Sequence, residues 1–152
     1  LRSFDPLLSD TAFIGLEESK ALLPGTCVMG CEVHCKWIKD MISTYDDATF
    51  LKEDGSLDMT TNVQRLGAKM VEGGLLHERK IQHLSQWGLR VYTHDYFSPI
   101  TSTRVMRKTK NTYSIHRFAG SWVDGKKGGF RNWWIVREGI NMLVQIKRKM
   151  KR

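Results

Sequence analysis

Short apolar blocks, bounded by glycine, proline or polar residues, recur along the chain. Blocks of this length predict buried or half-buried strands, because a helix needs a longer periodic run. The last block, Tyr113 to Phe118, alternates between two sets of side chains, as a strand with two different faces does. The predicted strands cover residues 12–16, 27–30, 80–84, 89–92 and 113–118, and a further extended piece is expected to stop at Ser98-Pro99.

Two other segments carry apolar residues at the spacing of an amphipathic helix. The first covers about 32–46. The second has its inner face at 63–71 and ends at Gly73-Gly74. It follows a run of cap-forming residues at 58–62, in which Asp58 is interpreted as a helix cap rather than as part of an acid–base pair. Because strands and helices alternate, the predicted class is α/β, with a mixed sheet flanked by helices.

The composition fits one globular domain and excludes several classes of protein. The chain has 152 residues, of which 41% are hydrophobic and 26% charged, so it can bury a core. No apolar run approaches the ~20 residues that span a bilayer. Neither a G-x-G-x-x-G nor a Walker A sequence occurs, which argues against a Rossmann dehydrogenase and a P-loop enzyme. With three cysteines and no visible secretory signal, we expect a reducing, cytoplasmic location.

Positive charge is concentrated at one end of the chain. The formal net charge is +8, and residues 131–152 hold seven basic residues against one acidic residue. Helical periodicity in the same stretch divides the chain into a domain at 1–128 and a basic amphipathic helix at 129–152. Such a helix suits an anionic membrane surface, but a core-packed helix with a solvated basic end explains the pattern equally well. A nucleic-acid-binding module is a further alternative, disfavoured because residues 1–100 are close to electrically balanced.

Three cysteines and a histidine form the first candidate for a metal site. They are Cys27, Cys31, His34 and Cys35. Because Gly30 is expected to end a strand between them, the three thiols are not expected to share one helix face. We therefore interpret them as buried or incidental thiols.

A second candidate for chemistry surrounds His116. On the predicted strand, His116 lies near the end, and Gly120-Ser121-Trp122 begins a loop. An imidazole can ligate a divalent cation, while a serine hydroxyl and an indole N–H can donate to phosphate oxygens. The alternative is a core histidine beside a packed tryptophan.

Four stretches in this order resemble one enzyme family. They are Phe4-Asp5-Pro6-Leu7-Leu8 through Ala12-Phe13-Ile14-Gly15, then Asp54 to Val63, then Val91-Tyr92 through Asp95-Tyr96-Phe97-Ser98-Pro99, and finally Thr109 to Trp122. The I-H-x-F-x-G-S-W piece, Ile115 to Trp122, is the most specific part. Together they resemble the family 32 glycosyltransferases, which include bacterial capsular and cell-surface polysaccharide transferases and fungal α-1,6-mannosyltransferases.

The resemblance implies a GT-A type fold and a metal-dependent hexosyltransferase. The donor would be a UDP- or GDP-hexose, and the acceptor a glycan or a lipid-linked molecule. Mn²⁺ or Mg²⁺ would hold the donor diphosphate. By resemblance, His116 would be the metal ligand, and Ser121 and Trp122 would bind the metal–diphosphate. Thr61 and Asn62 would form the catalytic site at a helix start, and Pro24-Gly25-Thr26 would lie near the acceptor.

One family motif is absent from the sequence. No D-x-D follows an apolar strand, although in the family this motif stands immediately before the stretch that corresponds to Leu1. The resemblance therefore implies that the chain is the carboxyl-terminal part of such an enzyme, with the nucleotide-binding half upstream. Because a hard cation needs carboxylate ligands, we expect the isolated chain to have little or no transferase activity.

Overall fold

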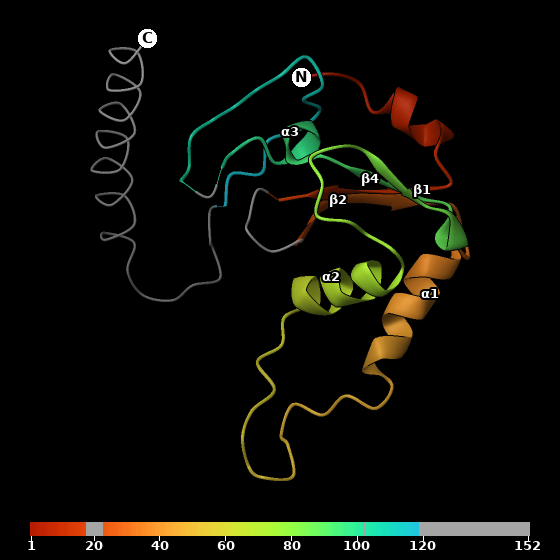
Figure 1. Ribbon diagram of the computed structural model, residues 1–152, viewed down its shortest axis with the longest axis vertical. Helices are drawn as coiled ribbons and strands as arrows, with labels where there is room; N and C mark the ends of the chain where they lie inside the picture. Colours follow the sequence, from red (N-terminus) through yellow and green to blue (C-terminus); the bar gives the residue numbers. More distant parts are fainter. Residues whose placement is uncertain (18–22, 102, 119–152) are drawn as a thin grey trace.

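A computed structural model describes residues 1–17, 23–101 and 103–118 of the chain. Within these ranges the strands form one mixed sheet in the order β2-β1-β4-β3 (Figure 1). β1 is parallel to β4, whereas β2 and β3 are antiparallel to their neighbours. The strands are β1 (Ala12–Leu16), β2 (Pro24–Cys31), β3 (Gln82–Leu84) and β4 (Leu89–Tyr92).

Helices cover both faces of this sheet. One face carries α1 (Lys36–Ile42), which continues into η2 (Ser43–Tyr45), together with α2 (Asn62–Glu72). The other face carries α3 (His94–Phe97), as Figure 1 shows. Two further short 3-10 helices, η1 (Asp5–Ser9) and η3 (Ser85–Trp87), complete the described elements.

The central strands explain why there are two cores. Side chains alternate along a strand, so Ile14 and Leu16 of β1 face one way and Phe13 faces the other. Ile14 packs with Trp37 and Leu66 from the α1 and α2 side. Phe13 packs with Phe97 and other aromatic residues on the α3 side, where the Phe13 and Phe97 ring centroids lie 6.0 Å apart. The sheet therefore separates an aliphatic core from an aromatic one.

The predicted α/β class, a mixed sheet flanked by helices, is confirmed. The strand predicted at 12–16 has the predicted bounds, and the helix predicted around 63–71 is α2. The helix predicted from 32 begins only at Lys36. β2 runs on to Cys31, and His34 adopts a left-handed backbone with φ 63°, which no helix accommodates.

The strand predicted at 113–118 is wrong. The amides of Tyr113 and Ser114 both donate to the carbonyl of Tyr96, and the amide of His116 donates to the carbonyl of Phe97. These bonds attach the segment to α3 instead of forming the regular ladder of a sheet. The extended piece predicted before Ser98 is likewise wrong, because that stretch forms α3. Within 113–118, Tyr113 is buried in the aromatic core, and the alternation of residue types does not reflect a strand.

Of the two interpretations of the thiols, buried or incidental, the structure excludes burial: Cys27 and Cys31 are exposed, and Cys35 is half-buried against the core on the α1 side. The prediction of the helix cap is wrong. Asp58 does not cap α2: Thr61 does, and Asp58 instead accepts from the amide of Thr60 and pairs with Arg65.

The described helices include none that is both long and apolar enough to cross a membrane. The basic helix predicted at 129–152 lies outside the described residues, and so does the boundary at residue 128. The division of the chain into two parts therefore stays a prediction.

We expect Gly15→Ala to destabilise the fold by about 1–3 kcal/mol through overpacking. A Cβ at Gly15 would lie 2.5 Å from Cδ2 of Phe97, a ring buried in the aromatic core. Urea denaturation measures the change. Gly25→Ala is the matched control, because the nearest atom to its Cβ would be Cγ of the movable Glu17 side chain at 3.3 Å and its next contacts, Cys27 Sγ and the Gly15 carbonyl oxygen at 3.6 Å, are ordinary; equal losses in both variants would contradict the expectation.

Candidate functional site

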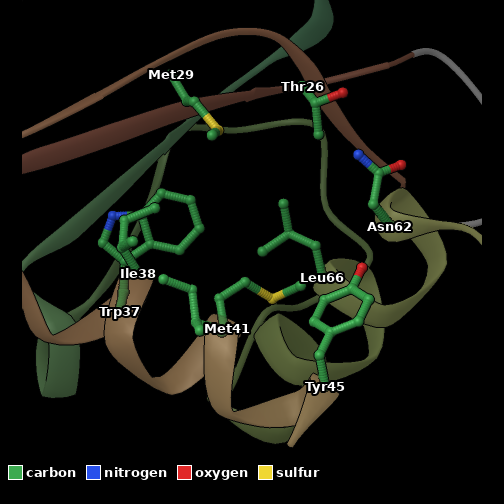
Figure 2. A pocket seen from close by; sticks show the side chains of 9 residues that line it. Thr26, Met29, Trp37, Ile38, Met41, Tyr45, Asn62 and Leu66 are labelled. Atoms are coloured by element: carbon green, nitrogen blue, oxygen red, sulfur yellow. The ribbon is translucent and has the colours of Figure 1, made fainter. Parts of the chain in front are cut away.

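A groove of about 230 Å³ lies between β2, α1 and α2 (Figure 2). Three polar residues, Thr26, Tyr45 and Asn62, stand at one end of it, while the atoms that face the groove are almost all apolar. The rest of the wall is apolar and includes the ring of Trp37 and the thioethers of two methionines. The lining residues are Thr26, Met29, Trp37, Ile38, Met41, Ile42, Tyr45, Asn62 and Leu66.

The polar end is held by a fixed arrangement of α2 and η2. Arg65 of α2 pairs with Asp58 and donates to the carbonyl of Thr44 at 3.4 Å. Its guanidinium also stands over the ring of Tyr45, 5.0 Å from the centroid. One arginine thus ties the chain before α2 and the residues after α1 to the same helix, and this fixes where Tyr45 lies.

Thr61 and Asn62, both predicted as catalytic, have different surroundings. The Thr61 hydroxyl oxygen accepts a hydrogen bond from the backbone amide of Gln64 at 3.3 Å. In return, the side-chain oxygen of Gln64 accepts one from the backbone amide of Thr61 at 2.8 Å. This reciprocal capping box begins α2. Asn62, one residue later, lines the groove beside Thr26 (Figure 2). By capping α2, Thr61 therefore fixes the position of Asn62 at the groove.

His116, the predicted metal ligand, lies on the opposite side of the sheet from this groove. Its amide bonds to Phe97 of the aromatic core, whereas Asn62 stands beside Leu66 of the aliphatic core. The nearest charged partner of the imidazole is Glu17, which directly follows β1, with 3.5 Å between Nδ1 and Oε1. Within the described residues Nδ1 is buried and has no hydrogen bond.

Glu17 connects several charged groups at the carboxyl end of β1. Burial raises the pKa of the Glu17 carboxyl, although the nearby His116 and Arg104 oppose this. Arg104 in turn stands over the ring of Phe118, 4.9 Å from its centroid. A partly desolvated carboxylate, an imidazole and a guanidinium therefore meet at this edge of the sheet.

The described residues do not fit a divalent metal ion by themselves. Across 1–17, 23–101 and 103–118, no three histidine, cysteine, aspartate or glutamate side chains converge on a position that could hold a metal. His116 and Glu17 supply one imidazole and one carboxylate, whereas Mn²⁺ and Mg²⁺ prefer several oxygen ligands. Ser121 and Trp122, predicted to bind the diphosphate, lie outside the described residues.

The segment that carries His116 is held by a hydrogen-bond network around Asp95 of α3. Thr93 and Thr109 donate to its carboxylate at 2.5 and 2.8 Å, and Thr112 donates to its backbone carbonyl at 2.8 Å. Burial acts to raise the pKa of Asp95, but the two threonine hydrogen bonds outweigh it and hold the pKa below its usual range. The ionised carboxylate therefore stabilises the position of residues 109–116.

The sequence did not indicate two residues of these sites. Tyr45 falls within the helix predicted at about 32–46, yet it ends the 3-10 turn that follows α1 and lines the groove. Glu17 gave no signal beyond its place directly after a buried strand, where side chains at the end of a parallel strand commonly meet a ligand.

Comparisons of the chain with protein-family models, with curated proteins and with solved structures find no match. The likeness to family 32 therefore depends on the quoted sequence segments alone. The groove and the charged groups around His116 at the carboxyl end of β1 are the candidate sites within the described residues.

We expect Thr61→Ala to lower the free energy of unfolding by about 1 kcal/mol, because the variant loses the capping box of α2. Chemical denaturation followed by circular dichroism gives this value. Thr61→Ser keeps the hydroxyl and should stay close to the parent, so a similar loss in both variants would mean that the cap is not the cause.

We expect the effect of Asp95→Asn on stability to depend on pH. A carboxyl whose folded pKa lies below its unfolded value of about 3.9 stabilises the fold above that value, and the contribution disappears as the pH falls through the folded pKa. The variant should thus be less stable than the parent at pH 7, and the difference should shrink below about pH 4. Thermal unfolding at both pH values measures it, and a gap independent of pH would refute the assignment.

Proposed function

We propose that the chain is part of a glycosyltransferase, and that the groove between β2, α1 and α2 binds a hexose. The donor is a UDP- or GDP-hexose and the acceptor is a glycan or a lipid-linked molecule, as in polysaccharide and glycoconjugate synthesis. In the transfer, the bond between the anomeric carbon of the hexose and the diphosphate breaks. A new bond forms between this carbon and the oxygen of an acceptor hydroxyl, which loses its proton. Within the α/β class, the proposal assigns the chain to a GT-A type fold.

One observation carries the proposal. The sequence stretches Pro24–Thr26 and Thr61–Asn62 are far apart in the chain, and the family resemblance assigns them to the acceptor and sugar sides of the site. Thr26 and Asn62 lie at the same end of one groove (Figure 2). The acceptor and sugar roles were assigned to two separate segments. Because residues of both segments lie at one groove, the structure is consistent with both roles.

The chemistry of the groove suits a monosaccharide. A hexose offers hydroxyls along its edges and C–H groups on its faces, so it needs polar groups at one side and an apolar or aromatic surface at another. Trp37 and its apolar neighbours supply the second over almost the whole wall, and Thr26, Tyr45 and Asn62 stand at one end, where the first is needed. A volume of about 230 Å³ lies below the ~300 Å³ at which pockets begin to hold drug-sized ligands. It therefore favours one sugar ring over a complete sugar nucleotide.

The nucleotide diphosphate is assigned to the other side of the sheet, beside His116. Both places adjoin the end at which β1 stops, because Leu16 pairs with Pro24 and β2 begins there. In the proposal the donor lies across this edge, with Ser121 and Trp122 on the diphosphate. Mn²⁺ or Mg²⁺ enters only as part of the metal–nucleotide complex, since the described residues form no metal site of their own.

We expect Asn62→Ala to weaken binding of UDP- or GDP-hexose about tenfold, the loss of one neutral hydrogen bond. Isothermal titration calorimetry of the parent and the variant tests this with each donor. Asn111→Ala is the matched control, since Asn111 lies in a turn away from the groove. Equal affinities of the parent and Asn62→Ala for every donor would exclude the groove as the hexose site.

The nucleotide side is tested separately. Titrating UDP and GDP in the presence of Mn²⁺, we expect His116→Ala to lose affinity for the nucleotide even when no sugar is attached. Unchanged affinity in this variant would remove His116 from the site. Because Asn62 and His116 lie on opposite faces of the sheet, the two variants should affect different parts of the donor.

A further inference from the structure

A second hollow lies next to the proposed hexose groove, at the corner where β2 gives way to α1. It is open to solvent, has a volume of about 740 Å³ and shares Ile38 and Ile42 with the first groove. Two of the three thiols of the chain, Cys31 and Cys35, line it. The proposed glycosyltransferase activity assigns no role to either of them.

The backbone between these cysteines brings them to the same place. Cys31 is the last residue of β2, and the amide of the next residue, Glu32, donates to the carbonyl of Thr11 at 2.9 Å. His34 then takes up a left-handed conformation with φ 63°, which turns the chain back. Cys35 follows directly as the N-cap residue of α1.

The two thiols also influence each other. Partial burial and the neighbouring Cys35 thiol raise the pKa of the Cys31 thiol to about 11. Cys31 therefore stays protonated at neutral pH. Cys27 lies elsewhere: its sulfur is near Gly25 and Glu17 at the opposite end of β2.

A metal site does not explain this pair. In the described part of the chain, no third histidine, cysteine or acidic side chain joins the two sulfurs in a geometry that could hold a metal ion. Solvent reaches both residues, although Cys35 also packs in part against the core on the α1 side of the sheet. The chemistry available to two accessible thiols that line one hollow is formation of a disulfide.

We propose that Cys31 and Cys35 form a reversible intramolecular disulfide by exchange with a low-molecular-weight disulfide. The thiolate of one cysteine attacks a sulfur of the reagent, and the S–S bond of the reagent breaks to release one thiol. The second cysteine then attacks the mixed disulfide and releases the other thiol. The protein loses two electrons and two protons, and the reagent is reduced to two thiols.

The bond would join the end of β2 to the residue that begins α1. Trp37, Ile38 and Met41, on the first turns of α1, line the hexose groove. Oxidation would thus fix the start of this helix against the sheet edge beside that groove. The proposal goes beyond the proposed transferase function and does not depend on it.

The test uses the full chain, reduced, freed of reductant and incubated with oxidised glutathione at about pH 8.5, near the ordinary pKa of a thiol. In Cys27→Ser, where no third thiol can take up glutathione, thiol titration should fall from two thiols to none, and the mass should fall by about 2 Da. Dithiothreitol should restore both thiols. Cleavage of the oxidised variant after Glu32 should leave two pieces joined until reductant is added.

Two variants separate this bond from general reactivity of the thiols. Cys31→Ser and Cys35→Ser should each acquire bound glutathione and form no internal disulfide. Serine is a good N-cap residue, so Cys35→Ser should keep α1 intact, and circular dichroism checks this. The proposal is overturned if the parent gains glutathione on these cysteines instead of closing the bond. A disulfide between Cys27 and either of the other cysteines would also overturn the proposal. So would the formation of disulfide-linked dimers alone.

Discussion

The parallel pairing of β1 with β4 is the constraint on which the described structure depends. Ala12 and Ile14 lie opposite Leu89 and Val91, and all four side chains are fully buried. A parallel pair needs a crossover connection, and here α1 and α2 lie between β2 and β3 in the chain. Because the pair is covered on both faces, each face has its own core and its own candidate site.

The local patterns that predicted elements well are those in which one physical cause dominates. β1 was predicted correctly because five consecutive buried residues suit a central strand and little else. α2 was predicted because its apolar spacing, its threonine cap and its terminal glycines agree. The residues at 113–118 misled because Tyr113 is buried by aromatic packing against Phe97 and Tyr96, and not by pairing with a strand.

The candidate sites were predictable to a smaller degree. Asn62 and Thr26 were selected by resemblance, and the structure adds that they share one groove. The separation of His116 from them was not predictable, since it follows from which face of the sheet each segment packs on. Tyr45 and Glu17 depend on contacts between distant segments, Arg65 over the tyrosine ring and His116 beside the carboxylate. A single sequence carries no local signal for such contacts.

The interruption in the pairing of β1 with β2 has a consequence for how the molecule behaves in a crowded solution. Among the described strands β2 lies at the edge of the sheet, and an eight-residue edge with unpaired amides and carbonyls invites another chain to add a strand. Its register shifts where Ile14 pairs with Met29 but Gly15 pairs with Gly25. Such an irregularity bends and twists the strand, so an incoming straight strand can match only part of it. The register shift therefore disfavours edge-to-edge pairing along β2.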